Sequence, residues 1–189
     1  MITEINDLRR CFGSGDPLNE AYHDDEWGVP VHGDQALYER IVLEGAQSGL
    51  SWITVLRKRE NYRAAFANFN PDVVAEFGDD DVERLMADAG IVRNRLKVNA
   101  AITNARAVVA LRESGSSLEE LFWSFAPEPR KAAPASWDAV PATTPESVAL
   151  AKALKKAGFV FVGPTTMYAA MQACGLVNDH IEGCIALRS

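Results

Sequence analysis

The sequence is poor in cysteine and histidine, with three of each among its 189 residues. A small, odd number of cysteines does not build a disulfide framework and is typical of a reducing compartment, where thiols are free or bind metal. No uninterrupted apolar run approaches the roughly 20 residues of a membrane helix. The first 13 residues, MITEINDLRRCFG, also lack the apolar centre of a signal peptide. We therefore expect a cytoplasmic protein that does not contact a membrane.

Positive charge is also scarce. Lys and Arg together number 19 against 26 Asp and Glu, which gives a formal net charge of −7. This balance weakens a nucleic-acid interpretation, because phosphate binding depends on clustered Lys and Arg. It does not exclude one, since local patches matter more than total charge. Two such patches are present, RKR at residues 57–59 and RNRLK at residues 93–97.

Length and composition predict one soluble globular unit. Hydrophobic residues make up 48% of the chain and the mean hydropathy is −0.09, which is ordinary for a soluble protein. A chain of 189 residues buries a sizeable core without disulfides. The sequence contains no internal repeat and no low-complexity tract, and we expect a monomer.

Apolar periodicity predicts a mostly helical chain. Residues 97–112 form the clearest amphipathic pattern. Residues 35–56 predict two helices around a turn, because Gly45 and Gly49 interrupt the pattern. Residues 165–174 predict a further helix near the end of the chain.

Capping residues mark two shorter helices. Asn70 followed by Pro71 is typical of a helix start. Asp79 is placed to cap a short helix that runs to Ala87, and Gly90 stands where a left-handed residue after a helix belongs.

Thr144 is typical of the start of another helix, which runs to Lys156. Before it, residues 127–145 hold five prolines and predict a long irregular connection. Residues 159–162 form the only strand-like run, and it is too short to build a sheet. Together these patterns predict an all-α protein.

The few cysteines and histidines offer ligands for one zinc site. The candidates are Cys11, His23, His32, Cys174, His180 and Cys184. His180 and Cys184 lie four residues apart, so a helix would place them on one face, and Cys11 and His23 could complete a closed, structural Cys2His2 site. The spacing of Cys11 and His23 matches no compact zinc finger, and isolated cysteines are often small core hydrophobes. The two remaining candidates, His32 and Cys174, are predicted to be ordinary structural residues.

Residues 85–97 read as helix, tight turn, basic residues and helix. Amide N–H groups in such a turn and at the next helix's N-terminus can bind a DNA phosphate. The groups available for this are Gly90, Arg93, Arg95 and Lys97. Such contacts position a protein and read no base sequence. An ordinary turn between helices with a solvated basic face explains the same pattern and is the commoner case.

The segment LEGAQSGLSW, residues 43–52, places Glu44 in an apolar setting. Buried carboxylates are rare unless they are paired or functional. A surface glutamate at a helix end is the alternative. The segment AYHDDEWGVP, residues 21–30, is similarly dense in aromatic and acidic groups.

These segments, with DAGIVRNRLK at residues 88–97 and KALKKAGFVFVGPTTMYAAMQACGLVNDHIEGC at residues 152–184, resemble the 3-methyladenine DNA glycosylase I family. The motifs are long, occur in the same order and span residues 11–184. The resemblance implies an all-α, helix-hairpin-helix fold, with the hairpin near residues 89–95. It also implies a structural zinc that joins the N- and C-terminal segments.

Carried over by position, the resemblance implies roles for individual residues. The zinc ligands would be Cys11, His23, His180 and Cys184. The base pocket would be formed by Phe12, Tyr22, Trp27, Glu44 and Trp52. The wedge that enters the DNA stack would be Gly49 and Leu50. The DNA backbone would contact Gly90, Arg93, Arg95 and Lys97.

The sequence departs from the family at Cys11-Phe12-Gly13, where members often have a tryptophan two residues after the first cysteine. Either Phe12 takes over the stacking, or the pocket is more open on that side. Between Lys97 and Leu121 there is no Asp. This is expected for this family, whose members lack the catalytic Asp of other helix-hairpin-helix glycosylases.

The resemblance implies a monofunctional glycosylase of base excision repair in the bacterial cytoplasm. It would flip 3-methyladenine out of alkylated double-stranded DNA and release the free base. Glu44 would accept hydrogen bonds from the exocyclic amine of the base, and the rings of Tyr22 and Trp52 would attract its positive charge. No lysine is placed as a nucleophile, so no lyase activity is expected.

Two other functions remain open at this point. The first is a zinc-stabilised helical module that binds DNA without chemistry. The second is a zinc hydrolase, which is disfavoured because protein would occupy all four ligand positions.

We expect residues 1–189 to form a single unit. Its parts would be an N-terminal extension at 1–10, a zinc-containing part at 11–34 and 145–189, a helical part at 35–126 and the irregular connection at 127–144.

Overall fold

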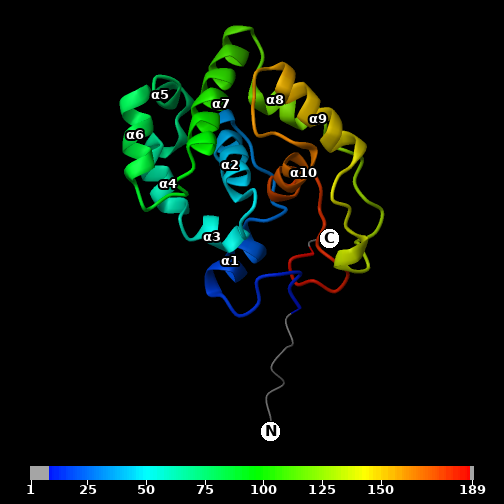
Figure 1. The fold of residues 1–189 in the computed structure, drawn as a ribbon. Helices are drawn as coiled ribbons and strands as arrows, with labels where there is room; N and C mark the ends of the chain where they lie inside the picture. The colour runs from blue at the N-terminus through cyan, green and yellow to red at the C-terminus, as the bar shows by residue number, and fades with distance from the viewer. Residues whose placement is uncertain (1–8, 188–189) are drawn as a thin grey trace.

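Helices supply the regular structure of the chain in the computed structural model, which describes residues 9–187 (Figure 1). Over that range there are ten α-helices, two one-turn 3₁₀ helices and no strand. In chain order they are α1 (Pro17–Asp25), α2 (Asp34–Gln47), α3 (Trp52–Leu56), α4 (Arg59–Ala65), η1 (Ala67–Phe69), α5 (Pro71–Ala75), α6 (Asp79–Ala87), α7 (Arg95–Glu113), α8 (Leu118–Trp123), η2 (Trp137–Ala139), α9 (Pro145–Lys156) and α10 (Pro164–Ala173). None of the helices in the described range is both long and apolar enough to cross a membrane. The predicted all-α class is confirmed, while residues 1–8 of the expected extension lie outside the described residues.

Helix α7 lies beside α2, α5 and α6 and packs against all three (Figure 1). Its apolar face buries Val98, Ile102 and Val108 in the main core. Each such side chain contributes about 1.5–3 kcal/mol through burial. The Tyr38 hydroxyl on α2 also donates to the carbonyl oxygen of Ala101 on α7, at 2.8 Å. Helix α10 packs against α2 and α9, so α2 is held between α7 and α10.

The break predicted within residues 35–56 occurs at Gly49 and not at Gly45. Gly45 lies inside α2. The chain turns at Gly49, whose φ of 80° lies in the left-handed region that glycine tolerates. This turn leaves the Leu50 side chain 42% exposed. It also brings the end of α2 close to the start of α3 at Trp52.

Residues 159–162 read as strand-like in the sequence but are not a strand in the structure. A side chain, and not a neighbouring strand, bonds to the backbone there. The buried Asn104 amide on α7 accepts from the Val160 N–H at 2.8 Å and donates to the Val160 carbonyl at 3.1 Å. Phe161 then turns the chain away with a φ of 58°. Both backbone groups of Val160 are therefore satisfied within the helical fold.

The helix over residues 79–87 has end residues that differ from the prediction. Its N-cap is Gly78 and not Asp79. The left-handed conformation predicted for Gly90 is wrong as well, since the helix ends at Asp88 in an extended conformation and Gly90 is not among the glycines with positive φ. Gly90 is needed for space instead, because a Cβ there would lie 2.9 Å from Asp88 Oδ1 and 3.0 Å from Asn61 Cβ.

Three other predicted helix ends are confirmed. The side chains of Asn70 and Thr144 cap α5 and α9. Helix α10 ends just before Gly175, which has a φ of 73°. A Cβ on Gly175 would lie 2.6 Å from the backbone nitrogen of Pro30, so glycine lets the end of α10 pack closely against residues 28–31.

The two ends of the described chain meet. The carbonyl oxygen of Arg9 accepts from the Ile185 N–H at 3.0 Å. The connection between α8 and α9, irregular as predicted apart from η2, returns to the same region (Figure 1). There the carbonyl oxygen of Pro134 accepts from the Glu182 N–H at 2.9 Å. Segments from the start, the middle and the end of the chain therefore lie together beside α1.

Candidate functional site

A cavity of about 330 Å³ lies between α1, α2, α3 and α10. Its lining includes every residue that was predicted to form the base pocket: Phe12, Tyr22, Trp27, Glu44 and Trp52. The other lining residues are Asn19, Gln47, Ser51, Ile53, Trp137, Ala169 and Gln172. The fold thus gathers one carboxylate and five aromatic side chains from separate segments around a single space.

The aromatic side chains form a nearly continuous wall. The Tyr22 and Trp52 ring centroids lie 4.8 Å apart at an interplanar angle of 42°. Phe12 meets Trp27 edge to face at 5.2 Å and lies 6.4 Å from Tyr22. These are favourable geometries for aromatic pairs, in which edges and faces meet. The wall therefore offers electron-rich ring surfaces to a ligand in the cavity.

Glu44 is the acidic group of the cavity. It lies in the last turn of α2 and only 6% of it is exposed. Burial raises the pKa of its carboxyl group to about 7, while the positive charge of Arg40 acts in the opposite direction. No donor within residues 9–187 forms a hydrogen bond to this carboxylate. Its acceptor capacity is therefore available to a ligand, and a cationic ligand would favour the ionised form.

Arg40 connects Glu44 to a partly buried ion network that the sequence did not indicate. Its guanidinium donates to Glu26 Oε2 at 2.9 Å and lies 5.9 Å from the centre of the Tyr22 ring. Glu26 also receives two hydrogen bonds from Arg59, at 2.6 and 2.9 Å. Burial acts to raise the pKa of Glu26, but the two arginines bring it below its usual value. The network places fixed positive charge behind the aromatic wall.

Two buried polar atoms of the cavity lining have no protein partner within the described chain. They are the indole nitrogen Nε1 of Trp52 and the amide oxygen Oδ1 of Asn19. Such atoms are costly to bury unless something bonds to them. An N–H donor and an amide are therefore available beside the Glu44 carboxylate for recognition of a polar ligand.

The sequence did not point to Asn19, Gln47, Trp137 or Gln172 as cavity residues. Gln47 follows Glu44 by one helical turn, which is a spacing that could have suggested it. Trp137 is far away in the chain and reaches the cavity only through the path of the 127–144 connection. No local pattern marks a contact of this kind.

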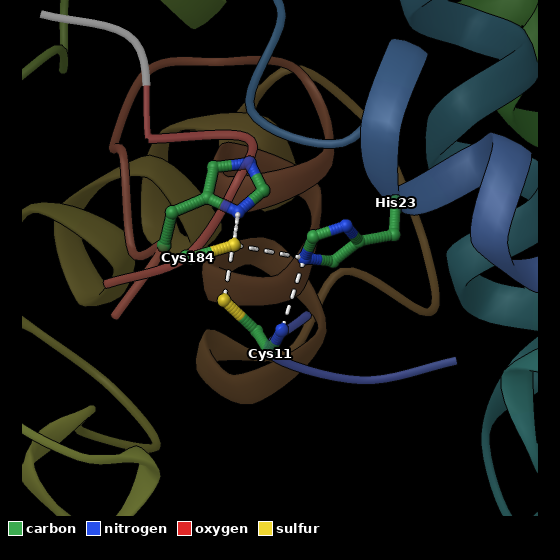
Figure 2. A group of neighbouring side chains, drawn as sticks. Cys11, His23 and Cys184 are labelled. Carbon is green, nitrogen blue, oxygen red and sulfur yellow. Dashed lines mark hydrogen bonds between the residues drawn. The ribbon is translucent and has the colours of Figure 1, made fainter. Parts of the chain in front are cut away.

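Close to the cavity, four side chains bring their ligand atoms together: Cys11, His23, His180 and Cys184. All four ligand atoms lie within 4.8 Å of one another. Figure 2 shows Cys11, His23 and Cys184 pointing toward a common centre. The Cys184 sulfur lies 3.4 Å from His23 Nε2 and 3.5 Å from His180 Nδ1, and the Cys11 sulfur also lies 3.5 Å from His180 Nδ1. A tetrahedral zinc site places ligand atoms roughly 3.3–3.8 Å apart, so this donor set fits zinc.

Hydrogen bonds with the surrounding groups orient the two imidazole rings of the cluster. His23 Nδ1 donates to Asp24 Oδ1 at 2.8 Å, and His180 Nε2 donates to the Trp27 carbonyl oxygen at 3.1 Å. The other nitrogens, His23 Nε2 and His180 Nδ1, face the two sulfurs, and His23 Nε2 also accepts from the Cys11 N–H at 3.1 Å. Ligating histidines in proteins are oriented by hydrogen bonds of this type. The Ile181 N–H also donates to the Cys11 sulfur at 3.2 Å.

The two remaining candidate ligands lie elsewhere, as predicted. The exposed His32 bonds to Glu119 at 2.8 Å and stacks on the Trp123 ring at 4.8 Å. Cys174 is fully buried at the end of α10, and burial raises the pKa of its thiol to about 12.

Lys97 has a different local role from the expected phosphate contact. Its ammonium group donates to the carbonyl oxygens of Ala46, at 2.8 Å, and Ser48, at 2.6 Å. These carbonyls end α2 just before Gly49 and Leu50. Lys97 therefore ties the base of this turn to the start of α7, and a phosphate would have to compete with these bonds.

The other predicted backbone contacts are arranged around the turn between α6 and α7. The Gly90 N–H donates to Asp88 Oδ1 at 2.7 Å, so it serves the turn itself. Arg95 forms an ion pair with Glu83 at 2.9 Å, and both side chains are more than half exposed. Exposed pairs of this kind are weak and exchange readily. Arg93 is exposed as well.

Comparison with known proteins identifies the family. A family model described as methyladenine glycosylase matches residues 12–187. DNA-3-methyladenine glycosylase 1 of Escherichia coli strain K12 is 52% identical over 179 residues, which cover 94% of this chain and 96% of the relative. A crystal structure of 3-methyladenine DNA glycosylase I has a TM-score of 0.90 at 55% identity, covering 94% of this chain and 98% of that one.

A structure of 3-methyladenine DNA glycosylase I from Staphylococcus aureus, described as showing the structural basis of 3-methyladenine recognition, has a TM-score of 0.90. It is 32% identical, and the match covers 96% of this chain and 98% of that one. These likenesses place the chain in the structural class of helical DNA glycosylases. The sequence matches make the assignment specific, and the chain belongs to the methyladenine glycosylase family.

Proposed function

We propose that this protein is a monofunctional DNA glycosylase that excises 3-methyladenine from alkylated DNA during base excision repair. The observation that carries this proposal is the buried Glu44 carboxylate, which has no hydrogen-bond partner among the described residues and faces an aromatic cavity. Membership of the methyladenine glycosylase family supports the choice of substrate. The sequence alternative, a DNA-binding module without chemistry, gives no reason to keep a carboxylate in this position.

Recognition follows from the charge of the methylated base. A 3-methylated adenine in DNA is positively charged, whereas normal adenine is neutral. Aromatic faces attract cations by roughly 0.5–2 kcal/mol each, and the Tyr22 and Trp52 rings line the cavity. The Glu44 carboxylate would accept hydrogen bonds from the exocyclic amine. The Trp52 indole N–H is available to an acceptor on the base.

The same charge explains how the bond breaks without a strong acid. The electrons of the bond between the sugar C1′ and the base leave with the base, which neutralises its positive charge. A water molecule then supplies its oxygen to C1′ and releases a proton. Glu44 first binds the base and second stabilises positive charge as it develops on the sugar. No lysine within residues 9–187 lines the cavity, so we propose hydrolysis without lyase activity.

The DNA must deliver the base by flipping it out of the duplex. We propose that Leu50, exposed on the turn that begins at Gly49, fills the gap left in the stack. The helices α6 and α7 with their turn would act as a helix-hairpin-helix motif that binds the DNA backbone. Arg93 supplies charge there, and Arg95 would exchange Glu83 for a phosphate. Lys97 would support the wedge through its bonds to the end of α2.

We further propose that the Cys11, His23, His180 and Cys184 cluster holds one structural zinc. The bound metal would supply coordination bonds that hold two ends of the chain together, and the four protein ligands leave no open position for a water. His23 and His180 would each bind through the nitrogen that faces the two sulfurs. The single-unit organisation, the monomeric state and the cytoplasmic location expected from the sequence stay predictions.

The test is release of 3-methyladenine from alkylated duplex DNA by wild type, Glu44→Gln and Glu44→Ala. Loss of a charge-assisted hydrogen bond predicts a rate reduced roughly 10- to 100-fold in both variants. Glu39→Gln is the control, because Glu39 lies on the same helix but pairs with Arg63 at 2.7 Å. Full activity of Glu44→Ala would remove Glu44 from the mechanism. Duplex binding by wild type with no base release would favour the non-catalytic module.

A further inference from the structure

Trp137 is a large aromatic side chain of the cavity that folding alone does not explain. It lies in η2, in the connection between α8 and α9, and is 46% exposed. It packs outside the main core, whereas Trp27 in the same cavity is only 7% exposed. A half-exposed indole gains little from burial on folding, so its position beside a cavity is informative.

The Trp137 ring extends the aromatic wall of the cavity. Its centroid lies 6.2 Å from the Phe12 ring at 56° and 6.0 Å from the Trp27 ring at 48°. Phe12 and Trp27 themselves meet edge to face at 5.2 Å. Trp137 therefore adjoins the part of the wall where Phe12 stands, and it is the most exposed of the five aromatic lining residues.

The backbone on both sides of Trp137 is fixed. Before it, the Pro134 carbonyl oxygen accepts from the Glu182 N–H at 2.9 Å. After it, the Val140 N–H donates to the Trp137 carbonyl oxygen at 3.1 Å, and the Val140 side chain packs against the main core. Prolines at several positions of residues 127–144 further limit the backbone. The backbone that carries the indole is thus restrained before a ligand arrives, which lowers the entropic cost of a contact.

We propose that Trp137 contacts the flipped base and contributes to specificity for 3-methyladenine, its indole covering the cationic ring from the solvent side of the cavity. This inference rests on the proposed glycosylase function. Tryptophan is the aromatic side chain that attracts cations most strongly, and the attraction is absent for neutral adenine. The contact would also bury the part of the indole that is now exposed.

The experiment compares Trp137→Phe, Trp137→Leu and Trp137→Ala with wild type. Single-turnover release of 3-methyladenine from alkylated duplex DNA, where the methylated base is cationic, is the deciding measurement. Calorimetric affinity for free 3-methyladenine, which is neutral after release, reports ring stacking alone. Loss of one ring–cation contact predicts a roughly 3- to 30-fold reduction in release by Trp137→Ala. Trp137→Phe should retain most of the activity and Trp137→Leu should resemble Trp137→Ala. Val148→Ala removes an equally exposed side chain, 48% exposed on α9, and should behave as wild type.

Equal release by wild type and Trp137→Ala would overturn the inference while the proposed function stands. Leucine matching tryptophan would also overturn it, because apolar cover alone would then suffice. Circular dichroism measures whether each variant is folded. If Trp137→Ala is unfolded, the comparison of Trp137→Phe with Trp137→Leu decides between ring contact and apolar cover. A wild-type protein that binds 3-methyladenine through Trp137 but releases none from DNA would overturn the proposed function and leave the contact standing.

Discussion

His180 Nε2 donates a hydrogen bond to the backbone carbonyl oxygen of Trp27 at 3.1 Å, and the two rings meet edge to face at 4.7 Å. His180 belongs to the Cys and His cluster, and Trp27 lines the cavity. Phe12 makes a second connection of this kind, packing edge to face on the His23 ring at 4.9 Å. The two sites therefore share a wall, and order in the cluster supports the position of the base pocket.

Replacement of Cys184 by Ala should reduce stability more than it alters substrate choice. The cluster would lose one of its four ligand atoms, and loss even of a supporting partner outside the ligand set costs 10- to 100-fold in metal affinity. We expect a loss of unfolding free energy on the order of 2 kcal/mol or more, with zinc content well below one per chain. Thermal unfolding and metal analysis measure both quantities.

Cys174→Ala is the matched control for Cys184→Ala. Cys174 is also buried but lies outside the cluster, so this variant should keep its metal even if it loses some packing energy. A Cys184→Ala protein with unchanged metal content and an unchanged unfolding temperature would disprove the proposed structural zinc site.

Glu44→Gln should stabilise the protein at alkaline pH. Burial raises the folded-state pKa of Glu44 to about 7 from an ordinary value of 4.5. The cost of ionising it in the fold is absent below about pH 4.5, grows as the pH rises and is complete above about pH 7. The upper bound on this cost is about 3 kcal/mol. Chemical unfolding at pH 5 and pH 8 should show a clearly larger gain for Glu44→Gln at pH 8, and an equal difference at both values would contradict the raised pKa.

Arg40→Gln should move the activity profile of the enzyme toward higher pH. The Arg40 charge lowers the pKa of Glu44, so removing it lets burial raise that pKa further and leaves less ionised carboxylate at neutral pH. Initial rates of base release should be measured between about pH 5.5 and 9. The rise in rate on the acidic side of this profile should move to higher pH, and the rate at pH 7 should be severalfold lower. Arg63→Gln is the control, since Arg63 pairs with Glu39 and Glu60 instead. Identical pH profiles for Arg40→Gln and wild type would show that the rise in rate on the acidic side reflects ionisation of a group other than Glu44.

Leu50→Ala should slow excision from duplex DNA while affinity for free 3-methyladenine is retained. Leu50 is 42% exposed, so its loss should change the unfolding free energy by less than about 0.5 kcal/mol. Unstacking a base costs a few kcal/mol, so a missing wedge predicts roughly a tenfold slower single-turnover rate. Val73→Ala on α5 removes a side chain of similar exposure and should have no effect. A parallel loss of base affinity in Leu50→Ala would place Leu50 in the pocket instead of the stack.

The sequence was sufficient for features that are local. The apolar face of α7, the Asn70 and Thr144 caps and the break before Trp52 follow from periodicity and capping chemistry, which involve residues a few positions apart. The same holds for the composition of the base pocket and the cluster, because the resemblance to a family transferred residue types in long motifs. The expectation that these residues converge in space came from that resemblance, since no spacing along the chain requires it.

Only the tertiary structure decided contacts between distant segments. Asn104 replaces a partner strand for Val160, Lys97 binds the carbonyls at the end of α2, and Trp137 reaches the cavity from the connection before α9. Each of these contacts depends on how separate helices and loops pack. Once packed, backbone and charged groups bond to whichever partner lies nearest in space. The spacing of residues along the sequence does not predict these partners. The sequence by itself thus determined the helical class, several of the helices and the residue types of the site, and the packing of the helices decided which side chains line the cavity.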